Sequence, residues 1–376
     1  MTAAAALSKD ELAEIKEYSR WRLACTLSDI FLDLLFYSAF VLFLAKPLDD
    51  WLFDSMNIVS PWTRLAAFYV ILYALNFVVS FPLAWISGHR LEQKFDLSRQ
   101  TFPRWLSRHL LKVALISAFV IALSEGLYLL IWVTGDYWWC WAAAGMFVVS
   151  ALLGQLAPVL ILPLFYKVEL LDDSALLKRF KGLAKDTDLR IEGVYRMGLS
   201  DETAKANAML AGLGRTRRVI LSDTLLDDFT PDEIEVVLAH EIGHHVFRHI
   251  RKFILFGVAQ SLCMFYVCDC VLRLNGFDPG GAEILPIRAL PLLALTMTIV
   301  GLIVGPIQNA ISRSFEVQCD TYALRQTQNA AAFRGAFQRL ARLNKADPDP
   351  HPLEVFFFHD HPPISQRLAL ADILDE

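Results

Sequence analysis

Two histidines and a glutamate in the stretch VVLAHEIGHHVFRHI (residues 236–250) could activate water on a metal ion. His240 and His244 are four residues apart, so on a helix they lie one turn apart on the same face. Two imidazoles placed in this way can bind one zinc ion, and Glu241 can reach a water on that ion as a general base. The competing interpretation is a solvated, histidine-rich helix. The other histidines of the stretch point elsewhere on such a helix and are expected at a surface or an interface: His245 and His249.

A third metal ligand must come from another part of the chain, because a catalytic zinc ion takes three protein ligands and keeps one position for water. The stretch AISRSFEVQCDTYALR (residues 310–325) supplies Glu316, with Asp320 one helical turn further on. Glu316 can complete a His₂Glu site. Asp320 can accept a hydrogen bond from a ligand histidine and fix its tautomer. Glu354 is the alternative third ligand.

The helix that carries the two histidines has a clear start signal. Thr230 is placed as the N-cap, Pro231 as the first helical residue and Glu233 as the partner of Thr230 in a capping box. Upstream of it, DDSALLKRFKGLAKD is expected to form an amphipathic helix. Three stretches with alternating polarity are expected to form short strands: LRIEGVYRM, KANAMLAG and RRVILSD.

The elements around these segments are long and apolar. Hydrophobic residues make up 55% of the 376 residues, and the net charge of −5 argues against a nucleic-acid partner. A membrane-spanning helix needs about 20 apolar residues. Runs of this length predict six spans, near residues 27–46, 64–86, 110–133, 138–166, 253–273 and 285–310. The expected fold is therefore mostly α, a multi-pass membrane protein with a zinc protease domain that contains a small β-sheet.

The spans divide the chain into four parts. They are an N-terminal membrane domain with four spans (1–166), a protease segment with the metal motif (167–252), two further spans (253–310) and a C-terminal protease segment with the third ligand (311–376). The loop after the second span is rich in Lys and Arg, which favours the cytosolic side. Alternation then places both termini and both protease segments, and so the catalytic site, on that side.

Five motifs, in this order among the spans, resemble the CAAX prenyl protease family: NAMLAG, LSDTLL, HEIGHH, SRSFEVQCD and HPPISQR. Members of this family are integral-membrane zinc endoproteases of the gluzincin type, and the resemblance covers essentially the whole chain. It implies a chamber enclosed by the membrane helices, with the zinc site near its cytosolic end. It also implies zinc on His240, His244 and Glu316, with Glu241 as the base and Asp320 behind the ligands.

The resemblance assigns roles to three more residues. Asn207 of NAMLAG would lie on the substrate side, where an edge strand aligns the substrate peptide by β-augmentation. His361 of HPPISQR would donate a hydrogen bond to the oxyanion, and Arg367 would brace the same region. Two neighbouring histidines compete for the role of His361: His351 and His359.

The expected function is a zinc endopeptidase that acts on a peptide or protein, prenylated or not, at the lipid bilayer. Eukaryotic members of the family usually have seven spans, so six spans favour a shorter bacterial type in the inner membrane. The native substrate and the oligomeric state stay open. A quality-control metalloprotease of the heat-shock type is the alternative enzyme. A metal-binding membrane transporter, with the histidines as transport ligands, is the alternative of another class.

Overall fold

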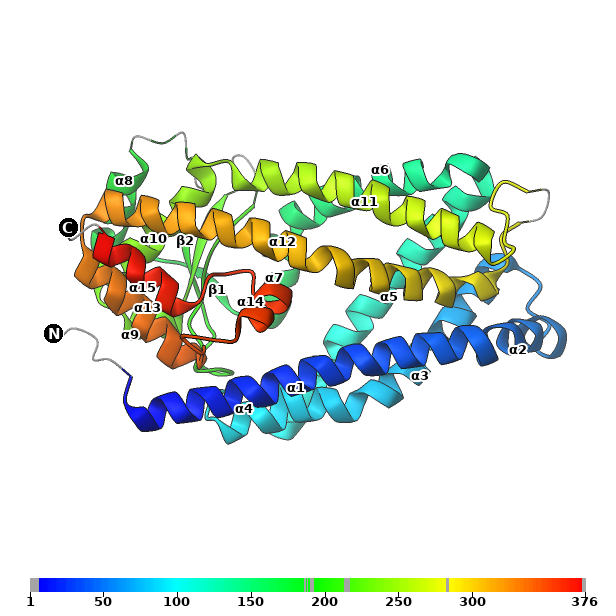
Figure 1. Cartoon of the computed structure of the whole chain (residues 1–376), viewed down its shortest axis with the longest axis horizontal. Helices are drawn as coiled ribbons and strands as arrows, with labels where there is room; N and C mark the ends of the chain where they lie inside the picture. The colour runs from blue at the N-terminus through cyan, green and yellow to red at the C-terminus, as the bar shows by residue number, and fades with distance from the viewer. Residues whose placement is uncertain are drawn as a thin grey trace.

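The structure of the protein is a computed structural model. It describes residues 7–185, 187, 189, 193–212, 217–281 and 284–373. Long helices form one end of the molecule, and a small sheet with shorter helices forms the other (Figure 1). The start of α1 and the last helix, α15, lie at the end with the sheet.

The long helices run along the longest axis of the molecule (Figure 1). They are α1 (Lys9–Ala39), α3 (Pro61–Trp85), α5 (Phe102–Thr134), α6 (Trp138–Leu156), α11 (His249–Leu274) and α12 (Leu290–Thr327). Short pieces extend or join them: η1 (Phe40–Leu44), α2 (Ala45–Asp50), η2 (Trp51–Ser55), η3 (Ile86–Arg90), α4 (Leu91–Lys94), η4 (Gly135–Tyr137), η5 (Ala157–Ile161), α7 (Leu162–Phe165) and η7 (Ile287–Ala289).

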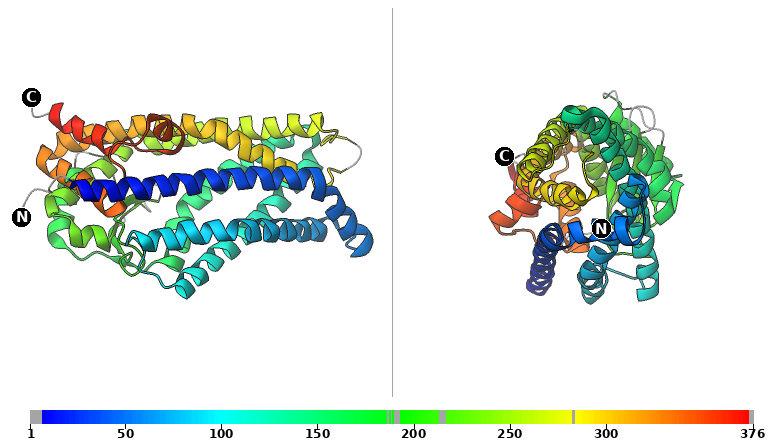
Figure 2. Two further views of the ribbon diagram at one scale, coloured as in Figure 1. Left: turned by 60° about the horizontal axis from the view of Figure 1, so that its bottom comes forward. Right: turned by 90° about the vertical axis from the view of Figure 1, so that its right-hand side faces the viewer.

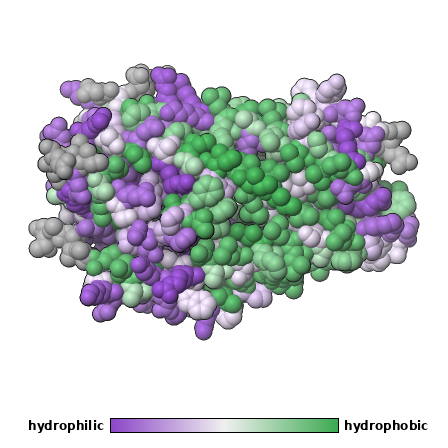
Figure 3. Space-filling view, in the orientation of Figure 1, coloured by the Kyte–Doolittle hydropathy of each residue, from purple (hydrophilic) through white to green (hydrophobic). Residues whose placement is uncertain are grey.

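The outer surface of the long helices is apolar. Figure 3 shows a hydrophobic band across the middle of the molecule, with hydrophilic surface at either end. Large side chains such as Leu42, Val133 and Leu255 are more than two-thirds exposed there. Such a belt would be a liability in water but matches the hydrocarbon region of a bilayer. The protein is therefore an integral membrane protein.

The number of membrane-spanning candidates differs from the sequence-based expectation. Five helical runs are long and apolar enough, one fewer than the six expected. The third run, Phe102–Phe165, contains both the third and the fourth expected span, because η4 joins α5 to α6 without a break in helical structure. Gly135 has a φ of 52°, which reverses the chain. A Cβ at Gly145 on α6 would lie 3.9 Å from Leu130 on α5, so the two helices form a hairpin.

Seen along their length, the membrane helices form a ring (Figure 2, right). A cavity of about 620 Å³ lies between the six long helices and has mostly apolar walls. Each helix contributes to its lining, for example with Tyr37 on α1, Tyr69 on α3, Leu127 on α5, Gly145 on α6, Phe265 on α11 and Met297 on α12. The described residues thus enclose an apolar cavity among the membrane helices, and none of the candidate site residues lines it.

The sheet has four strands in the order β1-β2-β4-β3. Their bounds are β1 (Val168–Leu170), β2 (Gly193–Met197), β3 (Ala208–Ala211) and β4 (Arg218–Ser222). β2 pairs parallel with β4, and β3 pairs antiparallel with β4. β2, β3 and β4 lie within the three stretches expected to be strands, whereas β1 was not expected. β3 is an edge strand, so one side of its backbone stays open for pairing.

Six helices complete the end that carries the sheet: α8 (Ser174–Ala184), α9 (Asp223–Asp228), α10 (Pro231–Val246), α13 (Ala330–Asn344), α14 (Pro352–Phe358) and α15 (Ile364–Ile373). Ile242 and Leu238 of α10 are buried in one core with Val219 and Leu221 of β4. On its other side, Val236 and Ala239 of α10 meet α12 and α13 in a second core. α10 is therefore fixed between the sheet and the C-terminal half of α12.

Candidate metal centre and active site

The helix α10 starts where the sequence predicts. Thr230 Oγ1 accepts a hydrogen bond from the Glu233 backbone N–H at 3.3 Å, and Glu233 Oε2 accepts one from the Thr230 N–H at 2.8 Å. Pro231 occupies the first turn, where its missing N–H costs nothing. This capping box fixes the first residue of α10 and with it the direction of every side chain downstream.

A glycine allows α10 to approach α12 closely. A Cβ at Gly243 would lie 3.1 Å from the Cα atom of Cys319, which is closer than side chains normally pack. The contact lies beside the functional groups of both helices, since His244 follows Gly243 and Asp320 follows Cys319. The absence of a side chain at Gly243 therefore brings the histidines of α10 to the carboxylates of α12.

His240, His244 and Glu316 converge at this crossing. His240 Nε2 lies 3.1 Å from Glu316 Oε2, and His244 Nε2 lies 3.2 Å from Glu316 Oε1. One ligand atom from each residue lies within 4.8 Å of the others, a spacing that can hold a metal ion. His240 and Glu316 are buried, and His244 is partly buried.

The chemistry of these atoms fits a cation. Asp320 Oδ1 lies 2.9 Å from His240 Nδ1 and can only accept, so Nδ1 carries the proton and Nε2 presents a lone pair. That nitrogen faces Glu316 Oε2, a buried carboxylate oxygen 3.1 Å away. A lone pair and a carboxylate oxygen 3.1 Å apart repel each other unless a proton or a metal cation lies between them. Two imidazoles and one carboxylate are the ligand types of a catalytic zinc site.

Asp320 is held by Arg367 from α15. The guanidinium donates two hydrogen bonds to the carboxylate, Nε to Oδ2 at 2.8 Å and Nη2 to Oδ1 at 2.6 Å. Arg367 also lies over the ring of Phe337, 3.9 Å from its centroid. Burial lowers the pKa of His240, but its hydrogen bonds to Asp320 and Glu316 outweigh burial and raise the pKa to about 9. From the sequence, Arg367 was expected to brace the His361 region. In the structure its guanidinium binds Asp320 directly.

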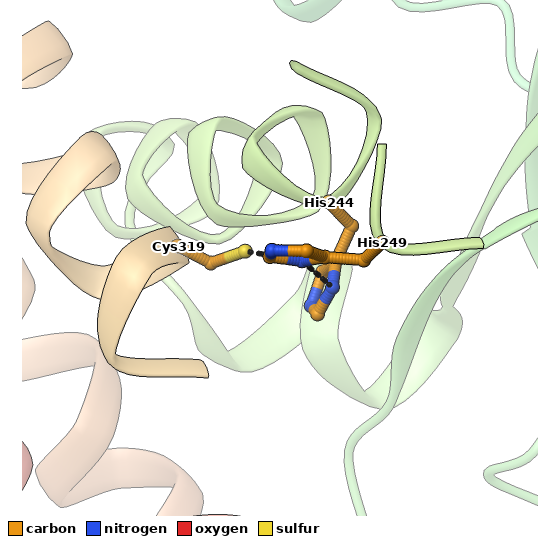
Figure 4. A group of neighbouring side chains, drawn as sticks. All are labelled: His244, His249 and Cys319. Carbon is orange, nitrogen blue, oxygen red and sulfur yellow. Dashed lines mark hydrogen bonds between the residues drawn. The ribbon is translucent and has the colours of Figure 1, made fainter. Parts of the chain in front are cut away.

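His249 was expected at a surface or an interface, but it is buried and contacts His244 (Figure 4). Its Nδ1 lies 3.1 Å from His244 Nδ1, and its ring stacks on Phe315 at 4.1 Å. Cys319 Sγ lies 3.6 Å from the same nitrogen. The helical-wheel argument failed because Arg248 adopts a left-handed conformation, with a φ of 57°, and ends α10. His249 therefore starts a new helix.

His245 takes a different direction. Its Nδ1 contacts Arg217 Nη1, at the start of β4 and away from the metal ligands. His244, His249 and Cys319 also lie close enough together to hold a cation. That group shares His244 with the first one but uses its Nδ1, the atom that contacts His249. We therefore interpret His249 as a partner of His244 rather than as a ligand.

Glu241 lies between the metal ligands and the edge strand. Its Oε2 accepts a hydrogen bond from the Leu210 N–H of β3 at 3.2 Å. This N–H points away from β4, so it belongs to the open edge of the sheet. Asn207 directly precedes β3 and is exposed. Its N–H donates to Ser222 Oγ and its carbonyl accepts from the Ser222 N–H, at 2.9 Å each. Glu241 and the open strand edge therefore face the same space.

His361 lies beside Glu316, the candidate third ligand. Its Nε2 is 3.4 Å from Glu316 Oε2, and its Nδ1 is 2.8 Å from Asp360 Oδ1. Burial lowers the pKa of His361, but Asp360 and Glu316 together raise it above its ordinary value. A protonated imidazole at this position is a hydrogen-bond donor.

The alternative residues contact other partners. Glu354 lies 3.2 Å from His359, and His351 accepts the Leu353 N–H at the start of α14. Of the three C-terminal histidines considered, the structure brings His361 to Glu316.

Comparison with known proteins agrees with this geometry. The family model described as "Peptidase family M48" matches residues 171–373. The family model described as "CAAX prenyl protease N-terminal, five membrane helices" matches residues 2–167. The described part of that stretch holds four long helices here: α1, α3, α5 and α6.

Relatives match over most of the chain. An uncharacterized metalloprotease of Bacillus subtilis, YhfN, is 28% identical over 89% of this chain and 82% of its own length. CAAX prenyl protease 1 of Saccharomyces cerevisiae is 27% identical over 85% of this chain and 74% of its own. The crystal structure of S. mikatae Ste24p superimposes with a TM-score of 0.83 at 26% identity, covering 97% of this chain and 89% of that one. The chain belongs to peptidase family M48 and is a membrane metalloprotease.

Proposed function

We propose that this protein is a zinc endopeptidase whose metal ligands are His240, His244 and Glu316. The observation that carries the proposal is the convergence of two imidazole Nε2 atoms on the two oxygens of one buried carboxylate. When bound, zinc would lower the pKa of a coordinated water and polarise the scissile carbonyl. The proposed ligands lie at the crossing of α10 and α12, where Asp320 and His249 contact the two histidines from behind.

The side chains around the ligands transfer the proton, stabilise the oxyanion and bind the substrate. Glu241 takes a proton from the attacking water and returns it to the leaving amine. His361, whose pKa is raised by Asp360 and Glu316, donates a hydrogen bond to the oxyanion in its protonated form. The open edge of β3 pairs with the backbone of the substrate, and Asn207 contacts the substrate beside it.

The substrate we propose is a peptide segment near the C-terminus of a protein, with or without a prenyl group. The relatives named CAAX prenyl protease support it, as does the apolar cavity between the membrane helices, which could admit a lipid chain. A quality-control protease would instead cleave unfolded membrane proteins. Cleavage of a farnesylated peptide, the same peptide without the lipid and an unfolded membrane protein separates these substrate classes.

We propose that the site faces the cytosol of a bacterial cell, at the inner membrane. The basic loop between the second and third long helices contacts the protease end of the molecule. Arg99 N donates to Glu202 O at 2.9 Å, and the Arg108 guanidinium pairs with the Glu202 carboxylate. Positively charged loops favour the cytosolic side, so this contact supports a cytosolic site.

The experiment that tests the proposal compares two substitutions on α10. Glu241→Gln should leave the zinc content unchanged and abolish peptide cleavage. Glu235→Gln is the matched control, since Glu235 lies on the same helix and pairs with Arg179 instead. Metal content is measured by mass spectrometry and cleavage by chromatography of the products. Full activity of the Glu241→Gln protein would refute the assigned base. Cleavage that survives complete metal removal would refute the zinc mechanism and reopen the transporter alternative.

A further inference from the structure

A group of arginines lies where α11 begins, at the end of the molecule with the sheet (Figure 1), and the steps above do not use it. Arg248 and Arg251 are exposed, and the Arg251 N–H donates to the Arg248 carbonyl at 3.0 Å, which holds the two residues within one turn. Arg217 directly precedes β4 and donates from Nη1 to His245 Nδ1. Three guanidinium groups are therefore available at one end of a membrane helix.

The charge of this arginine cluster is not balanced by a carboxylate among the residues that the structure describes. The Nε of Arg217 is buried and has no hydrogen-bond acceptor there. Burial and the positive charge of Arg251 both lower the pKa of Arg217. Arg367 differs in this respect, because Asp320 accepts two hydrogen bonds from it. An anion bound at the arginine cluster would supply the missing acceptor and reduce the repulsion between the cations.

The arginine cluster lies at the edge of the apolar belt. Arg251, Leu255, Leu262 and Tyr266 follow one another at intervals of four and seven residues, so they share one face of α11. Leu255 is 71% exposed and Tyr266 is 52% exposed, and neither lines the two apolar cavities beside α11. This face is therefore turned toward lipid. Four residues rise about 6 Å along a helix, so Arg251 lies one turn beyond Leu255, where headgroups replace acyl chains.

The chemistry of the arginine cluster and its place in the molecule select an anionic phospholipid as the ligand. Guanidinium groups bind phosphate oxygens through paired, charge-assisted hydrogen bonds. The exposed leucines next to Arg251 fit acyl chains, which a free phosphate ion lacks. A zwitterionic headgroup would bring an ammonium group to three cations, whereas phosphatidylglycerol brings only the charge of its phosphate. Each basic residue near an anionic membrane surface contributes about 1 kcal/mol to such an attraction.

One route from the arginine cluster to the proposed active site passes through Arg217. Its guanidinium contacts His245, the residue after the proposed ligand His244. The next residue, Arg218, pairs with Ala211 at the end of the open strand β3. An anion on Arg217 therefore acts at the root of the hairpin that carries the edge strand.

A second route passes through the joint between α10 and α11. Arg248 is the left-handed residue of this joint, with a φ of 57°. Lys252 Nζ lies 5.0 Å from the ring centroid of Phe315, and that ring stacks on His249 at 4.1 Å. His249 in turn contacts His244 at 3.1 Å. A headgroup that binds Arg248 would restrict the joint that holds His249 behind His244.

We propose that Arg217, Arg248 and Arg251 bind the headgroup of an anionic phospholipid, and that the bound lipid activates the protein by fixing the joint between α10 and α11. The lipid site does not depend on the proposed endopeptidase function, whereas the activation rests on it. Two measurements separate the two parts.

The first measurement is lipid binding by the full-length protein. Native mass spectrometry counts the phosphatidylglycerol or phosphatidylcholine that stays bound in detergent. Phosphatidylglycerol should bind about tenfold more tightly, as expected for charge-assisted hydrogen bonds. The double variant Arg248→Gln with Arg251→Gln should lose this preference. The matched control, Arg90→Gln with Lys112→Gln, removes two positive charges from exposed side chains on other helices and should keep it. An equal loss in both double variants would mean general attraction to the surface and would overturn the site.

The second measurement is cleavage of one uncharged peptide in two kinds of vesicle, phosphatidylcholine alone and phosphatidylcholine mixed with phosphatidylglycerol. The kcat/KM should be about fivefold or more higher in the mixed vesicles, and the ratio should fall toward one in Arg248→Gln with Arg251→Gln. Inorganic phosphate added to phosphatidylcholine vesicles should not reproduce the increase, and an equal increase would overturn the lipid as the ligand. Equal cleavage in the two vesicles, with phosphatidylglycerol still preferred in binding, would overturn the activation. Preferred binding without cleavage of any peptide would support the lipid site and count against the proposed function.

Discussion

His249 Nδ1 lies 3.1 Å from His244 Nδ1, so each histidine proposed to hold the metal has a side chain behind it. For His244 to offer Nε2 to the metal, its Nδ1 must donate, and His249 Nδ1 must then accept. The other nitrogen of His249, Nε2, is left as a donor and lies 3.3 Å from Gln318 Oε1. Because Gln318 Oε1 can only accept, it fixes the tautomer of His249, and His249 in turn fixes the tautomer of His244. His240 obtains the same orientation from Asp320, at 2.9 Å.

Replacement of His249 tests this chain of contacts. We expect His249→Ala to weaken zinc binding by about ten- to hundredfold, the usual effect of losing a partner of a metal ligand. His245→Ala is the control on the neighbouring position, because His245 faces Arg217. Zinc affinity is measured by competition with a chromophoric chelator. Equal affinities of the two variants would show that His249 only fills space.

The contact between His249 and His244 could not be predicted from the sequence. The four-residue spacing of His240 and His244 predicts the metal face of α10 because both residues belong to one uninterrupted helix. His249 escapes this argument because the left-handed residue Arg248 separates it from that helix. The conformation of a single arginine has no reliable signal in the sequence, and it decides whether His249 is exposed or buried.

Substitution of Gly243 should disturb the whole site. The Cβ of Gly243→Ala would lie 3.1 Å from the Cα atom of Cys319, and the backbone of α12 must move to admit it. We expect a loss of about 1–3 kcal/mol in the free energy of unfolding, as for other overpacked contacts, together with a lower zinc affinity. Gly257→Ala on α11 has no atom within 4 Å of the new Cβ and should cost nothing. Thermal unfolding in detergent and the zinc assay measure both effects. Unchanged values for Gly243→Ala would mean that the helices are further apart.

Removal of the Arg367 charge should destabilise the protein through Asp320. In Arg367→Met the buried Asp320 carboxylate loses both guanidinium hydrogen bonds. Breaking a buried ion pair from one side costs about 3–5 kcal/mol. The double variant Arg367→Met with Asp320→Asn removes the unpaired charge and should recover part of this loss. Chemical unfolding of the three proteins measures it, and a double variant less stable than the single one would contradict the explanation.

The membrane region and the third ligand were predictable to different degrees. Apolar length located each long helix, but the count differs because the turn at Gly135 keeps helical hydrogen bonding, which hydropathy does not report. Glu316 contacts the two histidines where α12 crosses α10. The histidines and Glu316 are some 70 residues apart in the sequence. The sequence supplies the residue types for that crossing and leaves Glu316 and Glu354 as candidates, and the packing of α12 against α10 supports Glu316.

Glu316 and Glu354 can be compared directly by matched substitutions. Glu316 lies 3.1 Å and 3.2 Å from the two histidine Nε2 atoms, whereas Glu354 lies 3.2 Å from His359. We expect Glu316→Gln to lose most of its zinc, since a neutral amide is a far weaker ligand than a buried carboxylate. Glu354→Gln changes the same chemical group outside the cluster and should keep one zinc ion per chain. Metal analysis after dialysis against a weak chelator gives the stoichiometry, and thermal unfolding shows whether each protein is folded. A folded Glu316→Gln protein with full zinc content, beside a zinc-depleted Glu354→Gln protein, would move the third ligand to α14.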